Sequence, residues 1–508
     1  MAKRKGSAGN SARRKKSTNK YSRRSGSNKL GTLCIILQTI ASIALMAVLY
    51  LLGMIPDKYL ILAAAILFFL WCVTLNSQVA RRKRGTWGKV FSLLMAVVMF
   101  TGSYYVAQAN NMIGKITGSN YKVDKMVVAV RADDSAETIE DAADYTYGVQ
   151  FEKGAGNIQT AVTDIEKQVG VDTIEVKEYD SVQDQAQALI DGDCDAIIYN
   201  SAYTSLMEEA VDGYSDKVKV LYTFNIRVEL DFGNSTGATD DSIIKEPFTV
   251  YISGIDVYGD VSETSRSDVN IIAVVNPQTH QILLVTTPRD YYVPIPKISG
   301  GQRDKLTHAG IYGVDASMRT LGELYETDIN YYARLNFTSL IDIVDTLGGI
   351  DVYSEYAFTT SEDSEHVMDV QEGYNHFNGE EALAFCRERH NVPGGDNQRG
   401  KDQQAVITAM LKKCLSPTML LNAIMEQVSK DVETNMSQEE INALIKYQLS
   451  NNPAWTIQSV AAEGTNTTGT CYSSGDTELF IMEPVESSVQ NIIDLANIVE
   501  EGGVLPEG

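Results

Sequence analysis

The residues of this chain that suit phosphate chemistry lie at the ends of predicted strands in its second half. Asp256 closes one apolar strand, Arg266 and Asp268 open the next, and Arg289 follows a third. If the second and third strands form a hairpin, Arg289 and Asp268 share one sheet edge, and an adjacent first strand adds Asp256. Carboxylates suit Mg²⁺ or Mn²⁺, and arginine forks suit phosphate oxygens. Spacing alone leaves another interpretation open, in which the aspartates cap loops and Arg289 forms a surface ion pair.

A second basic cluster favours the phosphate hypothesis. The sequence NGEE, starting at Asn378, predicts a capped helix that carries Arg387 and leads to Arg389. Residues two apart do not share a helix face, so both reach one ligand only if the helix ends beside them. The following loop, NVPGGDN, indicates such an end. Arg399 and Gln403 then open another predicted helix, and a helix N-terminus with basic residues is a natural anion site.

Other titratable residues near these motifs have weaker assignments. A base that accepts a hydroxyl proton is either Asp290 or Asp256, and Asp290 equally suits a pair with an arginine. His308 and His390 are expected to be structural, since no histidine spacing resembles a zinc site. Apolar helical stretches at 314–324 and 337–347 suit a cavity wall, although ordinary core is the favoured interpretation.

The elements that position these residues follow a membrane anchor. Residues 1–29 form a basic tail without acidic residues, and three apolar runs follow at 30–54, 59–75 and 90–109. Each approaches or exceeds the length of a membrane span. The tail and the basic loop at 81–84 indicate a cytoplasmic N-terminus, so that everything after about residue 110 lies outside the cell.

Charge is distributed unevenly along the chain. The first 109 residues hold seventeen of the 43 basic residues and one of the 66 acidic residues, so the remainder carries a formal charge of −39. Such a surface argues against a nucleic-acid ligand. The six cysteines lack CxxC spacing, which makes a metal cluster improbable and favours buried free thiols.

The outer part divides into two predicted domains. Residues 121–230 alternate strands and helices, which predicts a small α/β domain with parallel strands. Its segments YGVQFEKGAGN and EYDSVQDQAQALIDGDCDAIIYN resemble one lobe of an extracellular solute-binding protein, but a second lobe is missing, so a packing or spacer module is favoured. Residues 231–246 read as a linker. Residues 247–500 form the domain that carries the chemistry.

Six segments of that domain fall in the order of a known family's motifs. They resemble the LytR–CpsA–Psr family, and the three-span anchor with an extra domain resembles its capsular-polysaccharide branch. The segments are GIDVYGDVSETSRSDVNIIAVVN, ILLVTTPRDYYVPIP, DKLTHAGIYG, DTLGGIDVYSEYAF, NGEEALAFCRERH and GDNQRGKDQQAVI. The resemblance implies an α/β/α domain around a mixed sheet, with an apolar cavity for a polyprenyl tail.

The resemblance also implies an activity and a set of site residues. The implied activity is Mg²⁺-assisted transfer of a glycopolymer, of capsule or teichoic-acid type, from a polyprenyl-pyrophosphate carrier to peptidoglycan. Asp256 and Asp268 resemble the carboxylates of the metal and pyrophosphate site. The implied phosphate-binding residues are Arg266, Arg289, Lys305, Arg387, Arg389, Arg399 and Gln403. The last motif departs from many members at Gly400, Asp402 and Gln404.

Two other functions remain open. A non-catalytic membrane regulator that senses lipid-linked intermediates would explain the extra domain and the basic tail. A hydrolase that releases the lipid carrier would use the same metal and arginine site with water as the acceptor.

Overall fold

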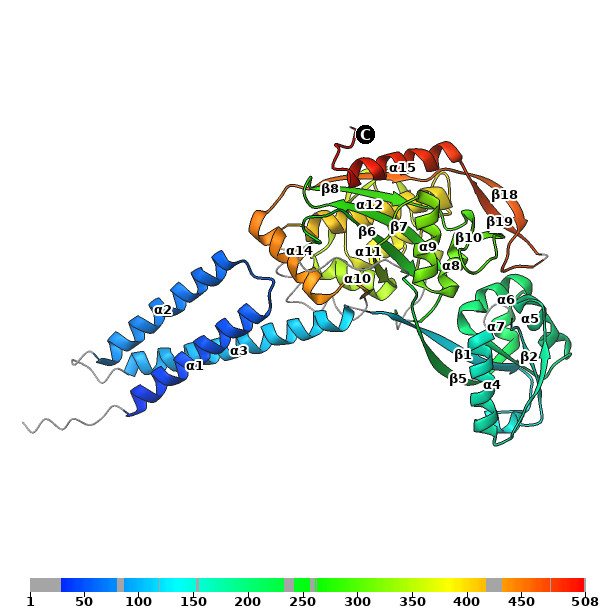
Figure 1. Cartoon of the computed structure of the whole chain (residues 1–508), viewed down its shortest axis with the longest axis horizontal. Helices are drawn as coiled ribbons and strands as arrows, with labels where there is room; N and C mark the ends of the chain where they lie inside the picture. Colours follow the sequence, from blue (N-terminus) through cyan, green and yellow to red (C-terminus); the bar gives the residue numbers. More distant parts are fainter. Residues whose placement is uncertain are drawn as a thin grey trace, which may run out of the picture. The chain divides into compact units, whose positions relative to one another are not determined.

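We describe a computed structural model of the chain (Figure 1). The description covers residues 29–79, 86–117, 119–151, 155–232, 242–255, 261, 263–416, 432–475 and 477–506. Two compact units can be distinguished by their internal contacts. The first comprises 1–45 and 63–101, and the second comprises 46–62 and 102–508.

Three long apolar helices account for the three predicted spans. They are α1 (Lys29–Leu51), α2 (Asp57–Val79) and α3 (Thr86–Ile116). Each contains a stretch long and apolar enough to cross a membrane. Large apolar side chains cover their surfaces, including Leu33, Phe68 and Leu94, which a lipid environment accommodates and water does not. The predicted anchor helices are therefore confirmed.

The small domain after the anchor is built on a five-stranded sheet in the order β3-β2-β4-β1-β5. Strand β2 pairs in parallel with β3 and β4, as predicted, whereas β1 pairs antiparallel with β4 and β5. The long strand β5 was not predicted, although its second half alternates apolar and polar residues as a half-buried strand does. The strands are β1 (Tyr121–Arg131), β2 (Thr146–Val149), β3 (Glu175–Glu178), β4 (Ala196–Asn200) and β5 (Val218–Glu229).

Helices cover both faces of this sheet. Helix α4 (Ala155–Val169) packs Ile158 and Ile165 against one face, and α5 (Val182–Asp191) packs Ala186 and Leu189 against the other. The connection β2-α4-β3-α5-β4 thus changes faces, as in doubly wound folds. The short helices α6 (Thr204–Ala210) and α7 (Tyr214–Lys217) complete the domain.

The larger domain surrounds a six-stranded mixed sheet in the order β16-β11-β6-β7-β8-β17. Its central strands β6, β7 and β8 form an antiparallel meander, while β11 and β17 join in parallel at either side. Almost every residue of β7 and β8 is buried, which requires cover on both faces. The strands are β6 (Phe248–Ile255), β7 (Ser267–Asn276), β8 (Gln281–Thr286), β11 (Tyr331–Leu335), β16 (Val432–Thr434) and β17 (Thr456–Ala461).

Two helical layers supply that cover, so the α/β/α prediction is confirmed. One core cluster joins the sheet to α10, α11, α12 and α14, and a second joins the opposite face to α8, α9 and α15 (Figure 1). The helices are α8 (Leu306–Tyr312), α9 (Val314–Tyr325), α10 (Phe337–Thr346), α11 (Gly379–Arg387), α12 (Asp396–Cys414), α14 (Gln438–Asn451) and α15 (Glu486–Glu500).

Short antiparallel strand pairs complete the domain around this core. They pair β9 with β10, β12 with β15, β13 with β14, and β18 with β19. Their bounds are β9 (Tyr292–Pro294), β10 (Arg303–Lys305), β12 (Ile350–Ser354), β13 (Phe358–Thr359), β14 (Asp369–Val370), β15 (Gly373–Phe377), β18 (Gly464–Thr470) and β19 (Glu478–Pro484). Most of the predicted linker, residues 233–241, lies outside the described residues.

Candidate functional site

The predicted pair of Asp268 and Arg289 forms at one edge of the central sheet. The β7–β8 register pairs Ile271 with Thr286. The same register, extended past the last paired residues at the open end of the two strands, places Asp268 opposite Arg289. Arg289 Nη1 lies 3.0 Å from Asp268 Oδ2. The Thr307 hydroxyl at the start of α8 donates to the other carboxylate oxygen at 3.2 Å. The hairpin hypothesis for these two residues is therefore confirmed.

Asp268 keeps its charge despite its burial. Burial raises the pKa of this carboxyl, but the guanidinium groups of Arg289, Arg399 and Arg266 and the hydrogen bond from Thr307 outweigh that effect. Its pKa is therefore held below the ordinary value. The site contains a carboxylate surrounded by cations, an arrangement that matches ionised ligands rather than neutral ones.

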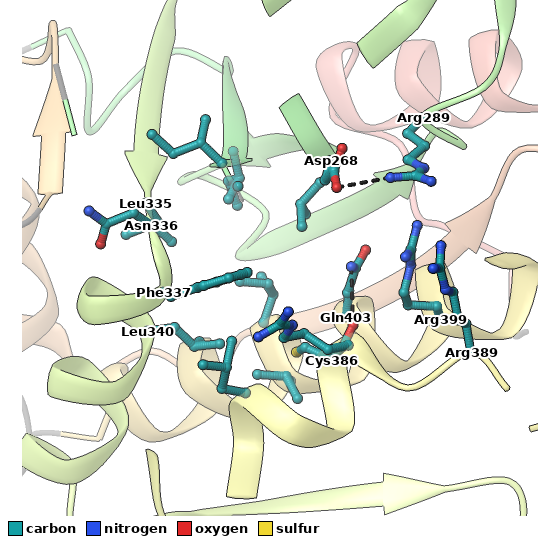
Figure 2. A pocket seen from close by; sticks show the side chains of 18 of the residues that line it. Asp268, Arg289, Leu335, Asn336, Phe337, Leu340, Cys386, Arg389, Arg399 and Gln403 are labelled. Carbon is teal, nitrogen blue, oxygen red and sulfur yellow. Dashed lines mark hydrogen bonds and ion pairs between the residues drawn. The ribbon is translucent and has the colours of Figure 1, made fainter. Parts of the chain in front are cut away.

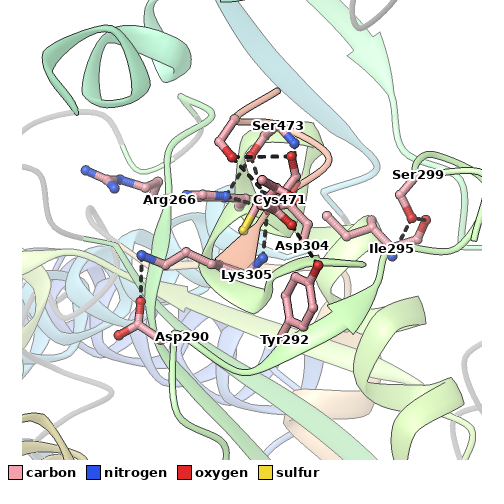
Figure 3. A network of polar contacts seen from close by, with 12 residues as sticks. Arg266, Asp290, Tyr292, Ile295, Ser299, Asp304, Lys305, Cys471 and Ser473 are labelled. Atoms are coloured by element: carbon pink, nitrogen blue, oxygen red, sulfur yellow. Dashed lines mark hydrogen bonds and ion pairs between the residues drawn. The ribbon is translucent and has the colours of Figure 1, made fainter. Parts of the chain in front are cut away.

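Asp290 and Lys305 lie behind this pair. Lys305 Nζ is 2.8 Å from Asp290 Oδ1 (Figure 3), and Arg289 Nε is 3.6 Å from Asp290 Oδ2. The Lys305 and Asp290 side chains are 10% and 5% exposed, and neither residue lines the cavity described below. Of the two roles considered for Asp290, the structure favours pairing with Arg289. Lys305, expected to touch a head group, instead pairs with Asp290.

The α11–α12 connection brings three more arginines to the same place. Asn378 caps α11 through the Glu381 amide, and the helix ends at Arg387, so Arg389 lies in the loop. Arg399 and Gln403 occupy successive turns of α12 and face the same space (Figure 2). The expected helix end between the two arginines is confirmed, although α12 begins before Arg399.

Arg387 is held in place by partners on two sides. Its guanidinium carbon lies 4.7 Å from the ring centre of Phe337, and Nη1 lies 2.5 Å from Glu365 Oε1. The Glu365 side chain is half exposed, so a phosphate can replace this partner at little cost in desolvation.

A cavity of about 180 Å³ connects this charged cluster to an apolar interior. Asp268, Arg289, Arg389 and Arg399 lie toward one end, whereas Leu335, Phe337 and Leu340 lie toward the other (Figure 2). The remaining apolar lining comes from β6, β7, α11 and α12: Ile252, Ile255, Val269, Leu383, Cys386, Val406 and Ile407. The cavity therefore suits an amphiphile that has a charged head and an apolar tail.

Sequence reasoning only partly located this apolar wall. Phe337 and Leu340 come from α10, which corresponds to one of the two stretches considered. The other stretch, in α9, packs on the opposite face of the sheet, where Val314 and Leu321 join ordinary core. An apolar helix face has the same periodicity whether it borders a cavity or a solid core, so the sequence carried no distinguishing signal.

Arg266 points to a different partner from the one predicted. Its Nη1 lies 2.8 Å from Glu209 Oε1 of the small domain, and Arg266 does not line the cavity. Arg266 contributes to the low pKa of Asp268 through its charge, so it remains close to the site. Its position indicates a link between the two domains.

The proposed metal site is described only in part. Asp256 lies outside the described residues, although it follows Ile255, which lines the cavity. Within the described ranges, no group of three or more His, Cys, Asp or Glu residues could hold a metal ion. Of the two aspartates predicted to hold the metal, Asp268 is described, and its two oxygens contact Arg289 and Thr307.

A buried hydrogen-bond network surrounds Asp304, the residue before Lys305. The Ser473 hydroxyl lies 3.0 Å from Asp304 Oδ1 (Figure 3), and His308 Nδ1 lies 2.7 Å from the same oxygen. His308 is fully buried, which agrees with its expected structural role. His390 instead lines the cavity, 3.1 Å from Asp363.

These features define a membrane-anchored protein with an α/β/α domain, whose cavity joins a cluster of arginines to an apolar lining. The chain belongs to the LytR–CpsA–Psr family, because the sequence model of that family matches residues 208–483, more than half of the chain. Named bacterial proteins are also similar to this chain. A polyisoprenyl-teichoic acid–peptidoglycan teichoic acid transferase of Bacillus cereus is 34% identical over 212 residues, which cover 41% of this chain and 67% of the relative. The namesake of Enterococcus faecalis is 35% identical over 39% of this chain and 65% of its own length.

Solved structures of related proteins cover similar parts of the chain. Bacillus subtilis TagV is 24% identical, with a TM-score of 0.43, over 51% of this chain and 98% of its own. A structure of TagT bound to LIIa-WTA gives 24% identity and a TM-score of 0.43 over 54% and 99% of the two chains.

A second sequence model, for DNA polymerase processivity factors, matches residues 82–199. That range combines α3 with the small domain up to β4 and omits β5. It corresponds to no folded unit of the chain, and no function follows from it.

Proposed function

We propose that the protein transfers a glycopolymer from a polyprenyl-pyrophosphate carrier to peptidoglycan on the outer side of the membrane. The observation that carries this proposal is the cavity itself, in which arginines from three separate segments meet an apolar pocket. A lipid pyrophosphate has both matching parts. The relatives named above act, by their names, on polyisoprenyl-linked teichoic acid and peptidoglycan. A capsule-type polymer is an equal candidate for the cargo.

The charges of the site supply the chemistry. A pyrophosphate resists attack because its negative oxygens repel nucleophiles. In the proposed reaction, a sugar hydroxyl of the wall forms a new bond to the polymer-proximal phosphorus. The bond between that phosphorus and the bridging oxygen breaks, and lipid monophosphate leaves with the electron pair. Arg289, Arg387, Arg389 and Arg399 stabilise the charge on the phosphate oxygens and on the leaving group.

Magnesium, with manganese as the substitute, is the proposed cofactor. Asp268 and Asp256 would hold it, and the ion would supply further neutralisation of pyrophosphate charge. The low pKa of Asp268 supports this proposal, because hard cations require an ionised carboxylate. Asp256 is also the better candidate for the base, since Asp290 is occupied by Lys305 and Arg289.

The outward orientation is supported by two observations. The basic tail and the basic loop at 81–84 indicate the cytoplasmic side. The turn between α1 and α2 contacts the larger domain: Asn442 of α14 donates to the Leu52 carbonyl at 2.8 Å, and Lys58 donates to the Ser450 carbonyl at 2.7 Å. That turn and the domain therefore belong on the same side of the membrane.

The deciding experiment uses the full chain purified in detergent. We expect polyprenyl phosphate to co-purify, and we expect a polymer–peptidoglycan conjugate when lipid-linked polymer and wall fragments are added with Mg²⁺. Chelation with EDTA should abolish the conjugate, and added Mg²⁺ or Mn²⁺ should restore it.

Product analysis also separates the alternatives. Free polymer phosphate without conjugate would identify a hydrolase. Lipid binding without any turnover would favour the non-catalytic regulator. The presence of the small domain is the feature that suggests this alternative. Retention of lipid at wild-type levels in both Arg289→Ala and Arg387→Ala would contradict the assignment of the site.

A further inference from the structure

A second site lies on the face of α12 next to the phosphate cavity. Arg399, Gln403, Val406 and Ile407 line the cavity at helical spacing. An adjoining face of the helix lines a separate groove of about 740 Å³, bounded also by β17 and the paired strands β12 and β15. The α12 residues of the groove are Gln398, Lys401, Asp402, Gln404, Ala405, Thr408, Ala409, Lys412 and Lys413. One helix, about 10 Å across with its side chains, therefore separates the two sites.

Two exposed tyrosines form one wall of this groove. Tyr353 of β12 and Tyr374 of β15 are direct cross-strand partners, with ring centres 5.4 Å apart and planes at 75°. They are 51% and 75% exposed, although burying such rings is favourable. A pair of aromatic rings fixed on a hairpin and left open to solvent is a surface for stacking a flat, partly apolar ligand.

The floor and the rim of the groove define the chemistry of that ligand. Ala405 and Ala409 of α12 and Ala461 of β17 are small side chains that leave room above the helix. Side chains that can form hydrogen bonds surround them. Among these are Thr408 and Ser459, whose hydroxyl oxygens lie 3.4 Å apart. An apolar stacking wall with a polar rim matches a sugar ring, which has apolar C–H faces and hydroxyls at its edge.

Charge distinguishes this groove from the cavity. Three carboxylates and three lysines line the groove, Asp351, Glu355, Asp402, Lys401, Lys412 and Lys413, so it has no excess of either sign. The cavity, by contrast, is lined by four arginines and two aspartates. A phosphate-rich chain would favour the cavity, whereas the groove suits uncharged rings.

We propose that this groove binds the uncharged sugar rings of the acceptor glycan and holds them beside the phosphate cavity. The proposal rests on the proposed transfer function and adds the place where the acceptor binds. Stacking on Tyr374 and Tyr353 provides the affinity, and the polar rim orients the hydroxyls. The shared helix α12 connects the acceptor site to the arginines that hold the donor.

The test measures glycan binding by the full chain in detergent. The probe is a short oligomer of β-1,4-linked N-acetylglucosamine, titrated by calorimetry or ligand-observed NMR. We expect Tyr374→Ala and Tyr353→Ala each to weaken binding about tenfold, the loss typical of one aromatic contact. Tyr374→Phe should retain binding, because it keeps the ring. Tyr356→Ala is the matched control, since Tyr356 is exposed on the same segment but does not line the groove.

Each outcome bears on the proposal. Unchanged binding in both alanine variants, or no binding of the oligomer by the wild type, would overturn it. Tyrosine-dependent binding of poly(glycerol phosphate) in place of the neutral oligomer would assign the groove to the donor polymer instead. Co-purified polyprenyl phosphate is measured on the same samples, so that glycan binding in the groove and lipid binding in the cavity are tested separately. Loss of glycan binding with normal lipid content is expected for the tyrosine variants. Failure of the groove would leave the proposed function intact.

Discussion

At the scale of single residues, charge in the cavity depends on a few close pairs. Arg289 contacts both Asp268 and Asp290, and through Asp290 it is linked to Lys305. A phosphate that binds Arg289 therefore enters an ordered chain of alternating charges. Such an arrangement requires little rearrangement when a dianionic head group arrives, which is the condition for strong electrostatic stabilisation.

We expect Arg289→Ala to lower the transfer rate by the equivalent of about 2–4 kcal/mol, as for the loss of one oxyanion donor. The variant should also retain less polyprenyl phosphate. Arg303→Ala is the control, because Arg303 is 52% exposed and pairs with Glu483 on the surface. The measurement is conjugate formation per unit time together with lipid content. Equal losses in both variants would count against the site.

Asp402 gives a prediction about pH. Burial raises the pKa of Asp402 to about 7, whereas an unfolded aspartate titrates near pH 4. The folded chain binds this proton more tightly, so the free energy of unfolding falls as the pH rises from about 4 to about 7. Asp402→Asn should therefore raise the unfolding temperature at pH 8, with a difference that shrinks toward pH 4.

At the scale of elements, local pairing explains which parts of the site were predictable. Asp268 and Arg289 are joined by a short hairpin, so strand pattern alone placed them together. Arg387 and Arg389 were predictable from the capping box and the loop that ends α11. Each of these inferences needed only neighbouring segments of the chain.

Features that depend on distant segments were not predictable. The partner of Arg266 comes from the small domain, and the cavity wall combines strands and helices from across the larger one. Strand β5 is the exception, because it was missed although its residues 222–229 alternate between apolar and polar, a pattern that predicts a half-buried strand. Asp256 remains a prediction, since it lies outside the described residues.

The cap of α11 can be tested against a matched cap elsewhere. Asn378 and Ser437 each form a capping box, at α11 and α14 respectively. Replacing either by alanine should lower stability by about 1 kcal/mol. Only Asn378→Ala should also reduce lipid retention, because α11 carries Leu383, Cys386 and Arg387 to the cavity. Thermal unfolding and lipid content measure the two effects, and equal lipid loss in both variants would contradict the argument.

At the scale of the whole molecule, the small domain contacts the larger domain near the site. Glu209 pairs with Arg266, the Gln183 amide donates to the Ser473 carbonyl at 3.0 Å, and Thr264 donates to Asp124 at 3.0 Å. These contacts hold the segment just before Asp268 and the turn that carries Ser473. The small domain therefore packs against the larger domain beside the site, which agrees with its predicted role as a packing or spacer module.

We expect Arg266→Ala to affect domain contact more than ligand binding. Because Arg266 pairs with Glu209 and does not line the cavity, lipid retention should fall less than in Arg289→Ala. Limited proteolysis should cleave between the domains faster, and Glu209→Ala should reproduce that result. If Arg266→Ala lost as much lipid as Arg289→Ala, Arg266 would have to be assigned to the phosphate-binding residues after all.

Cys386 offers a way to follow the protein at work. All six cysteines are free, and Cys386 is the cysteine that lines the cavity within the described part of the chain. Burial raises its thiol pKa far above the ordinary value, so the group stays protonated and resists oxidation. Because the thiolate is the reactive form, a thiol reagent should modify Cys386 only slowly in the folded protein. Its labelling rate would therefore report how often this part of the cavity opens to solvent.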